Sequence, residues 1–295
     1  SNNTRKPIWG YKYLVGAVVV LGFLAFIVWA HHMYMTGMGT VISAFFQTTT
    51  LLISIPSVII LTCLFISLWG GSIRFNTPML FALAWLPMFG IGGLTGLPLG
   101  FNFSDVALHD SYYVIAHFHY VVAPGTIFAI FAGVYYWYPK MTGRIMSEFW
   151  GRVHFWSSLI FMNLIFMPMF AQGMAGMSRR MSDGGATYSL ANPDNADAGG
   201  ALSDTIMGLN VSISAAAWAM LLAQIPFIIN LFWSVKYGKK VESDNPWRAT
   251  TLEWETPTPP PHGNFTKEIK VYRDPYEYSV PGAKEDFTPQ AQPSR

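Results

Sequence analysis

Charged residues are scarce in this sequence and cysteine is nearly absent, and each shortage excludes a class of protein. Asp, Glu, Lys and Arg make up 12% of the 295 residues, about half the share usual in a soluble domain. The single cysteine, Cys63, lies within an apolar run, which excludes a disulfide framework and indicates a small packing residue. The formal net charge of +2 gives no support for nucleic-acid binding.

Long apolar runs take the place of the missing charge. Hydrophobic residues make up 52% of the chain and aromatic residues 16%, and a helix needs about 20 consecutive apolar residues to cross a bilayer. We therefore predict an all-α membrane protein with six transmembrane helices. They are expected at residues 13–30, 42–68, 79–99, 113–138, 149–170 and 206–235.

The loops between these runs differ in charge. Lys and Arg gather near cytoplasmic helix ends, and an alternating path puts most of them on one side, which predicts that both ends of the chain are cytoplasmic. The basic residues on that side are Arg5, Lys6, Lys12, Arg74, Lys140, Arg144, Arg152, Lys236, Lys239 and Lys240. The other side holds Asp105, Asp110, Asp183, Asp194 and Asp197, with Arg179 and Arg180.

The two ends of the chain differ from its middle. No N-terminal signal peptide is visible, and because the chain begins at Ser1 without methionine, shortly before an apolar run, we expect the natural protein to continue upstream. The stretch "TPTPPPHGNF" is typical of a proline-rich surface strap followed by a loose polar end. We therefore expect a transmembrane domain at residues 1–241 and a tail at 242–295.

Glycines cluster in the third run, where small residues favour close helix packing or a flexible helix end. They are Gly90, Gly92, Gly93, Gly96 and Gly100.

Two histidines stand two positions apart in the fourth run, within "HDSYYVIAHFHY". Positions two apart on an α-helix point about 200° apart, so His117 and His119 do not easily bind one ion. Two planar cofactors, one on each side, could each take one imidazole, as haem iron does. The alternative is a packing role, which would leave several polar atoms needing partners in the hydrocarbon.

The other histidines give weaker evidence of ligand binding. His31 and His32 end the first run, where adjacent imidazoles can turn toward one ion, and imidazole suits copper, zinc or iron; a surface pair is the alternative. His154, near the start of the fifth run, is expected to hydrogen-bond to a neighbouring helix. His262 lies in the tail and is expected at the surface.

The side opposite the basic loops offers ligands for a hard cation and partners for carboxylates. The His109–Asp110 step suits Mg²⁺ or Mn²⁺, although Asp110 as a helix N-cap would look the same in sequence. Arg179 and Arg180 are suited to bidentate pairing with carboxylates, and a solvated loop pair is the alternative.

Taken together, the chain resembles the C-terminal half of subunit I of the haem-copper oxidases, of the cytochrome c oxidase type. Four stretches carry the resemblance: "VWAHHMYMTGM", "GGLTGLPLGFNFSDVALHDSYYVIAHFHYV", "GMAGMSRRMSD" and "TLEWETPTPPPHGNF". They cover most of the chain. The resemblance implies that the six helices are the second half of a twelve-helix bundle.

The resemblance also implies a role for each site residue. His31 and His32 match two of three copper ligands, His117 the axial ligand of a high-spin haem facing that copper, and His119 an axial ligand of a low-spin haem. Two further pairs match the magnesium site and the haem propionate site. They are His109 with Asp110 for magnesium, and Arg179 with Arg180 for the propionates.

The implied activity belongs to a larger assembly. The family oxidises cytochrome c and reduces oxygen to water with proton translocation, using two haems, expected here to be of the a type. The third copper-ligand histidine, its linked tyrosine and the second low-spin haem ligand are not in this chain, so it is expected to be an enzyme only within the complete complex. Expected partners are the missing N-terminal half, subunits II and III, cytochrome c and the lipid bilayer of a bacterial inner membrane.

One departure from the family pattern concerns the pathway for protons. The family usually has a lysine in the second run, but residues 48–69 contain none and Ile60 falls near its position. Ser54, Ser57 and Thr62 could support a water chain instead, and an acid expected after "TGM" is replaced by Gly39 and Thr40. Two alternatives therefore remain: a nitric oxide reductase of the same superfamily, and a non-catalytic membrane scaffold whose histidines only hydrogen-bond.

Overall fold

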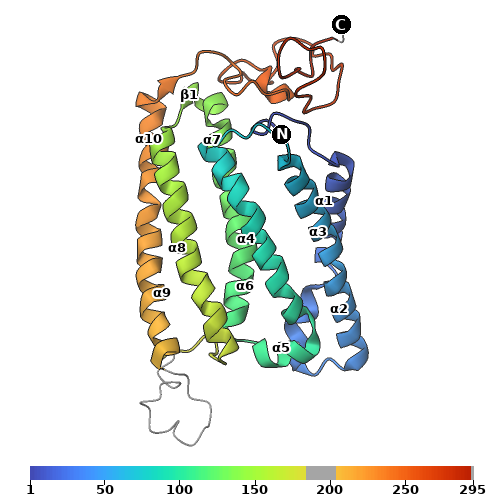
Figure 1. Ribbon diagram of the computed structural model, residues 1–295, viewed down its shortest axis with the longest axis vertical. Coiled ribbons are helices and arrows are strands. Elements are labelled where there is room, and N and C mark those ends of the chain that lie inside the picture. Colours follow the sequence, from blue (N-terminus) through green and yellow to red (C-terminus); the bar gives the residue numbers. More distant parts are fainter. Residues whose placement is uncertain (184–203, 294–295) are drawn as a thin grey trace, which may run out of the picture.

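The computed structural model describes residues 1–183 and 204–293, and its helices run side by side along one axis (Figure 1). Six helical stretches are long and apolar enough to cross a membrane, which confirms the predicted number. They are Tyr11–Thr36, Thr40–Leu68, Thr77–Gly100, Tyr112–Thr142, Glu148–Met174 and Thr205–Tyr237. The predicted residues Asp194 and Asp197 lie outside the described ranges.

Most of these stretches contain more than one helix. The elements of the first three are α1 (Tyr11–Ala25), the 3₁₀ helix η1 (Trp29–Thr36), α2 (Thr40–Leu52), α3 (Ser54–Leu68) and α4 (Thr77–Gly100), and the short α5 (Asn102–Leu108) follows the third stretch. The others are α6 (Tyr112–Val122), the π-helical turn η2 (Ala123–Phe128), α7 (Ala129–Thr142), β1 (Arg144–Ile145), α8 (Glu148–Met174), α9 (Asp204–Ala223), α10 (Ile225–Tyr237), β2 (Lys239–Lys240) and the 3₁₀ turn η5 (Leu252–Trp254).

Prolines mark several of the interruptions. Proline has no backbone N–H to donate and its ring crowds the preceding turn. Accordingly, Pro56 follows the break at Ile53, Pro226 follows the break at Gln224, and Pro124 lies in the π-helical turn. The first span differs from the uninterrupted helix expected at residues 13–30, because α1 ends at Ala25 and a 3₁₀ turn carries the histidine pair.

The connections alternate between the two ends of the bundle, as the sequence predicts. Both chain ends lie at one end with β1, and α5 lies at the other (Figure 1). The backbone of Arg74 donates to Asn3 O, 2.8 Å away, and Arg144 pairs with Lys240 across β1 and β2, so these basic loops are neighbours. We call this end the basic end and the α5 end the acidic end.

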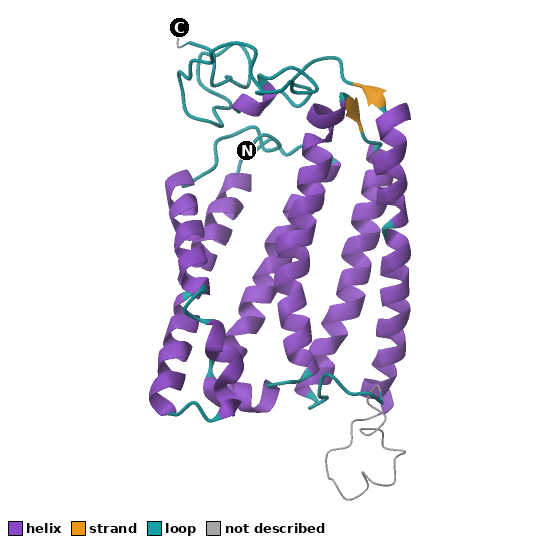
Figure 2. Ribbon diagram, turned by 180° about the vertical axis from the view of Figure 1, so that it is seen from behind, coloured by secondary structure: helices purple, strands orange, loops and turns teal. Residues whose placement is uncertain are grey.

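Two groups of helices make up the bundle. Helices α1–α3 stand beside the larger group of α4 and α6–α10 (Figure 2). A cluster of buried aromatic residues joins α4, α7 and α8, and a second cluster joins α4, α6 and α8. Phe81 is fully buried in the first cluster, and Ala116, Tyr120 and Met162 are fully buried in the second.

The α4 glycines serve close packing at three of the five predicted positions. A Cβ on Gly92 would lie 3.0 Å from the backbone of Tyr120, one on Gly96 2.8 Å from the His117 ring, and one on Gly100 3.3 Å from Thr50 Cγ2. Close packing is contradicted at Gly90 and Gly93, where a Cβ would meet no atom of the described residues within 4 Å. Gly92 and Gly96 therefore allow α4 to approach α6, and Gly100 allows it to approach α2.

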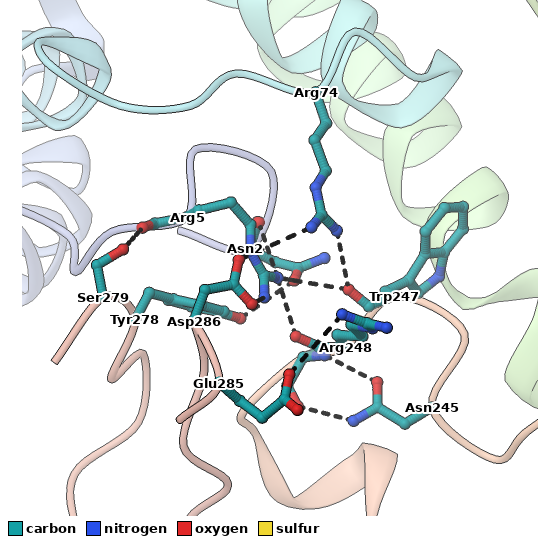
Figure 3. Close-up of polar contacts among 11 residues, drawn as sticks. Asn2, Arg5, Arg74, Asn245, Trp247, Arg248, Tyr278, Ser279, Glu285 and Asp286 are labelled. Atoms are coloured by element: carbon teal, nitrogen blue, oxygen red, sulfur yellow. Dashed lines mark hydrogen bonds and ion pairs between the residues drawn. The ribbon is translucent and has the colours of Figure 1, made fainter. Parts of the chain in front are cut away.

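The tail lies over the basic end, tied to several elements. Arg5 is buried and donates to both carboxylate oxygens of Asp286 at 2.7 Å (Figure 3). The Trp247 indole donates to Tyr136 O at 2.8 Å. Buried Lys140 donates to Thr256 O at 2.7 Å. The polar end after the proline-rich stretch was expected to be loose, but Asp286 in it bonds to Arg5 and the backbone of Gln290 bonds to Thr250 O.

Candidate functional site

One cavity of about 820 Å³ lies between the two groups of helices, toward the acidic end. Its volume falls within the range of about 300–1,000 Å³ that is usual for ligand sites. Seven of the eight candidate site residues line it: His31, His32, His109, Asp110, His117, Arg179 and Arg180. Residues from four separate stretches of the sequence therefore meet around one space.

The adjacent histidines approach each other through their Nε2 atoms, which lie 3.1 Å apart. That separation allows both nitrogens to contact one ion at the metal–imidazole distance of about 2.0 Å. The Nδ1 atom of His31 lies 3.0 Å from Thr50 Oγ1, and a bond of this kind orients a metal-binding imidazole. The 3₁₀ turn η1 brings the two Nε2 atoms together. The two histidines fit a copper ion that has other ligands besides them.

His117 reaches the cavity from α6 and is held by α4. Its Nδ1 donates to Gly92 O at 2.9 Å and lies 3.3 Å from Thr95 Oγ1. Gly96 leaves room for the ring, because a Cβ there would lie 2.8 Å from Cε1 of His117. With Nδ1 bonded to the protein, Nε2 is the nitrogen suited to bind a metal in the cavity.

His119 turns to the other side of α6, toward α8. Its ring stacks on Phe166 with centroids 4.1 Å apart, and its Nδ1 donates to Ile115 O at 2.8 Å. It does not line the cavity that His117 lines. The two imidazoles therefore face different helices, as the two-residue spacing predicts, and the Nδ1 bond again leaves Nε2 for a ligand.

At the acidic end, His109 lies between two carboxylates. Its Nδ1 is 3.4 Å from Asp105 Oδ2 and its Nε2 is 3.6 Å from Asp110 Oδ2. Arg179 holds the other Asp110 oxygen, Oδ1, through Nε at 2.7 Å and Nη2 at 2.5 Å. This hydrogen bond lowers the pKa of Asp110, whereas burial raises the pKa of Asp105.

The structure corrects one sequence interpretation in this region. The N-cap of α6 is Ser111, whose side chain accepts from Tyr113 N, so Asp110 is not the cap. Arg179 pairs with the carboxylate of Asp110, in agreement with the expected pairing to carboxylates, and Arg180 is exposed at the cavity rim. Asp105 was missed by sequence reasoning, and its position four residues before His109 on α5 was the available signal.

In residues 1–183 and 204–293, no group of three or more His, Cys, Asp or Glu side chains could hold a metal ion. Each candidate ion site therefore has at most two such ligands from the part of the chain described.

The remaining histidines lie away from the cavity. His154 is fully buried, with Nδ1 3.2 Å from the Tyr135 hydroxyl and Nε2 3.1 Å from Gln224 Oε1, so it joins α7, α8 and the break before α10 as expected. His262 is exposed in the tail, also as expected.

The polar residues of α3 separate into two sets. Ser54 and Ser57 line the cavity, and Ile60 is buried one turn further along the helix. Thr62 is exposed on the outside of the bundle. Of the three hydroxyl residues expected to support a water chain, Ser54 and Ser57 therefore line the cavity and Thr62 does not.

The six spans and the histidine-lined cavity define a membrane protein with a ligand site buried between its helices. A family comparison narrows this class. The chain belongs to the family described as Cytochrome C and Quinol oxidase polypeptide I, which matches residues 1–198.

Individual relatives agree with the family. The chain is 45% identical over 295 residues to alternative cytochrome c oxidase subunit 1 of Bradyrhizobium diazoefficiens, covering 99% of this chain and 48% of the relative. It is 42% identical over 278 residues to cytochrome c oxidase subunit 1 of Synechocystis sp., covering 94% of this chain and 47% of the relative. The chain thus spans about half the length of the curated relatives it matches.

A solved structure supports the fold. A heme-copper terminal oxidase dimer determined by cryo-EM aligns with 80% of this chain and 44% of its own, with a TM-score of 0.64 and 18% sequence identity. At that identity the likeness concerns the arrangement of helices alone.

Proposed function

We propose that this chain is the C-terminal half of subunit I of a respiratory terminal oxidase that oxidises cytochrome c and reduces oxygen to water. The single observation that carries the proposal is the cavity, around which the converging Nε2 atoms of His31 and His32 and the imidazole of His117 gather. Membership of the oxidase family supports the same activity. The activity belongs to the complete complex, in which the N-terminal half supplies the remaining ligands.

Each histidine has a defined task in this proposal. His31 and His32 hold copper, His117 holds the high-spin haem beside it, and His119 holds the low-spin haem on the α8 side. Haem iron and copper together supply the electron transfer that reduces oxygen, with protons taken from the inner side. The protein orients three of the imidazoles through Nδ1, using Thr50 Oγ1 and the carbonyl oxygens of Gly92 and Ile115.

The acidic end carries two further proposed sites. His109 and Asp110 bind magnesium, because a carboxylate oxygen beside an imidazole suits Mg²⁺ or Mn²⁺ when water fills the other positions. Arg179 and Arg180 bind haem propionates, since guanidinium groups form bidentate bonds to carboxylates. Both arginines line the cavity, which supports this assignment.

The surroundings follow from the charge pattern. Basic residues such as Arg74, Arg144 and Lys240 lie at the basic end, which supports an inner membrane protein of a bacterium with both ends of this chain cytoplasmic. The proposed partners are the missing N-terminal half, oxidase subunits II and III, cytochrome c and the lipid bilayer. Residues 1–241 form the proposed membrane domain and 242–295 its tail, and the haems are proposed to be of the a type.

A nitric oxide reductase of the same superfamily is the second candidate. The observation that favours it is the apolar Ile60, buried where the family usually has a lysine. A buried proton path needs polar groups or water, and Ser54 and Ser57 are the α3 hydroxyl groups of residues 48–69 that line the cavity. Oxygen reduction needs more protons per turnover than nitric oxide reduction.

Steady-state assays of the purified complete complex test the proposal. We expect rapid oxygen uptake with reduced cytochrome c and slow consumption of nitric oxide. Rapid nitric oxide consumption with negligible oxygen uptake would establish the reductase instead. Absence of haem absorbance from the intact complex would favour a non-catalytic scaffold, and oxygen uptake without acidification outside sealed vesicles would retain the oxidase but remove the proton pump.

A further inference from the structure

A groove of about 430 Å³ runs along one face of α8, in the half of the helix nearer the basic end. The opposite face of the helix packs against its neighbours. Gly151 lies against Thr77 of α4, and fully buried His154 bonds to Tyr135 of α7. The groove therefore lies on the outside of this group of helices, where a spanning helix meets the bilayer.

The lining of the groove suits a hydrocarbon chain. Phe149, Trp156 and Ile160 are 66%, 53% and 50% exposed, and Val153 lines the groove with them. The lining residues run from 149 to 161, so the groove extends about 18 Å along the helix at a rise of about 1.5 Å per residue. One leaflet contributes about 15 Å to the hydrocarbon core. The length of the groove therefore matches one leaflet, the one at the basic end.

Arg152 supplies a positive charge to this apolar groove. Its side chain is 56% exposed, its Nη2 donates to Phe75 O at 3.1 Å, and its Nε lies 3.8 Å from Glu148 Oε2. That carboxylate oxygen also accepts from N and Oγ1 of Thr77, at 3.0 and 2.9 Å. Among the described residues, no other acceptor bonds to the guanidinium. Because an arginine beside hydrocarbon needs polar partners, the guanidinium has capacity for an anion.

We propose that this groove binds an anionic phospholipid of the leaflet at the basic end. The phosphate lies at the guanidinium of Arg152, since Arg forms charge-assisted and often bidentate bonds to phosphate. One acyl chain lies along Val153, Trp156 and Ile160. A free phosphate ion would use the guanidinium alone, whereas a lipid uses both the charge and the apolar length of the groove.

Photo-crosslinking of the complete complex tests this proposal. The complex is reconstituted into phosphatidylcholine vesicles containing a trace of phosphatidylglycerol or phosphatidylcholine with a diazirine on one acyl chain. Labelled peptides are then identified by mass spectrometry. We expect phosphatidylglycerol to label residues 149–161 about fivefold more than phosphatidylcholine does, because one arginine at the membrane surface raises the affinity for anionic lipid by about that factor. Unlabelled phosphatidylglycerol is expected to compete, and inorganic phosphate is not.

Two variants separate the charge from the apolar lining. Arg152→Gln removes the charge and is expected to abolish the preference for phosphatidylglycerol. Ile160→Trp fills the apolar part of the groove and is expected to lower labelling by phosphatidylglycerol several-fold with Arg152 in place. Lys239→Gln changes an exposed basic residue outside the groove at the same end of the bundle, and this control is expected to be labelled as the parent complex is.

Three results would overturn the proposal. Equal labelling by the two lipids in the parent complex would show ordinary contact with the bilayer. Competition by inorganic phosphate as strong as that by phosphatidylglycerol would show a site for a free anion. Absence of labelling at residues 149–161 would show that another chain covers the groove. If Arg152→Gln does not assemble, Ile160→Trp decides, and labelling equal to that of the parent overturns the lipid site.

Discussion

The ring nitrogens of the buried histidines separate ligand candidates from structural residues. His31, His117 and His119 each direct Nδ1 to a protein acceptor, which leaves Nε2 for a metal. His154 instead bonds through both nitrogens, to Tyr135 and Gln224. The Nε2 of His31 also has a partner, but that partner is the Nε2 of His32 at the cavity, and one ion could bind both nitrogens. The partners of His154 are a phenol and an amide away from the cavity, so His154 is a structural link and not a candidate ligand.

Gly96→Ala tests how closely the His117 ring packs against α4, because the substitution adds a single carbon atom. The added Cβ would lie 2.8 Å from the His117 ring, and the ring cannot move without losing its bond to Gly92 O. We expect the complete complex to lose most of its high-spin haem signal, with an overpacking cost of about 1–3 kcal/mol. Gly90→Ala, where a Cβ meets no atom within 4 Å, is the matched control. Equal spectra for the two variants would contradict the account.

At the residue scale, the sequence predicts the side of a helix from which a side chain projects better than it predicts which side chains come into contact. The different orientations of His117 and His119 follow from helix geometry alone. The 3.1 Å approach of His31 and His32 depends on a 3₁₀ turn that apolar periodicity does not reveal. Asp105 escapes prediction because its burial arises from the packing of α5 against other elements, and sequence shows it as an ordinary loop acid.

At the scale of elements, the contact between α6 and α8 sets the acidic end of the site. Tyr112 N donates to Met177 O at 3.0 Å, and Arg179 N donates to Asp110 O at 2.8 Å. The residues after α8 are therefore aligned with the start of α6, which brings Arg179 to Asp110. Gly173 allows this, because a Cβ there would collide with the backbone of Tyr113.

Gly173→Ala is expected to separate the two helices and lower the yield of complex with both haems. The collision involves backbone atoms, which cannot move aside as a flexible side chain can. Gly208→Ala in α9, where a Cβ meets no atom within 4 Å, provides the control. Haem content per complex measures the effect, and a full yield from Gly173→Ala would show that the contact is dispensable.

The number of spans follows from apolar runs because the bilayer fixes the length of a crossing helix. Their internal breaks are harder to predict. Pro56 and Pro226 identify two breaks, but Pro87 and Pro98 lie inside α4, which continues past them. Packing against neighbouring helices decides which proline interrupts a helix, and a single sequence does not contain that information.

At the scale of the whole molecule, the tail joins the two groups of helices at the basic end. Arg5 precedes α1 and Arg74 precedes α4, and both lie within 4 Å of Asp286 in the tail (Figure 3). Trp247 in the same tail bonds to Tyr136 of α7. The cavity lies between these two groups, so the tail limits how far they can separate.

Asp286→Asn is expected to increase the rate at which protease cleaves the tail of the complete complex several-fold, because local opening governs cleavage. Glu242→Gln removes an exposed pair with Lys239 on the same end and is expected to change nothing. Cleavage rates measured by gel give the comparison. Equal rates for Asp286→Asn and the parent would contradict the role of this ion pair.

The stability that the Arg5–Asp286 ion pair contributes depends on pH in a defined direction. The hydrogen bond from Arg5 lowers the pKa of Asp286, so its contribution to stability is present above the ordinary value of about 3.9 and is lost as pH falls through the lowered value. The difference between parent and Asp286→Asn is therefore expected to be constant from about pH 5 to pH 8 and to shrink below about pH 4.

The optical spectrum of the complete complex with each α6 histidine replaced tests the central claim most directly. The claim is that His117 and His119 hold two different haems on different sides of one helix. His119→Leu is expected to remove the low-spin haem signal and spare the copper, whereas His117→Leu is expected to disturb the high-spin haem, with exposed His262→Ala unchanged. Equal and small effects from both α6 substitutions would contradict the account.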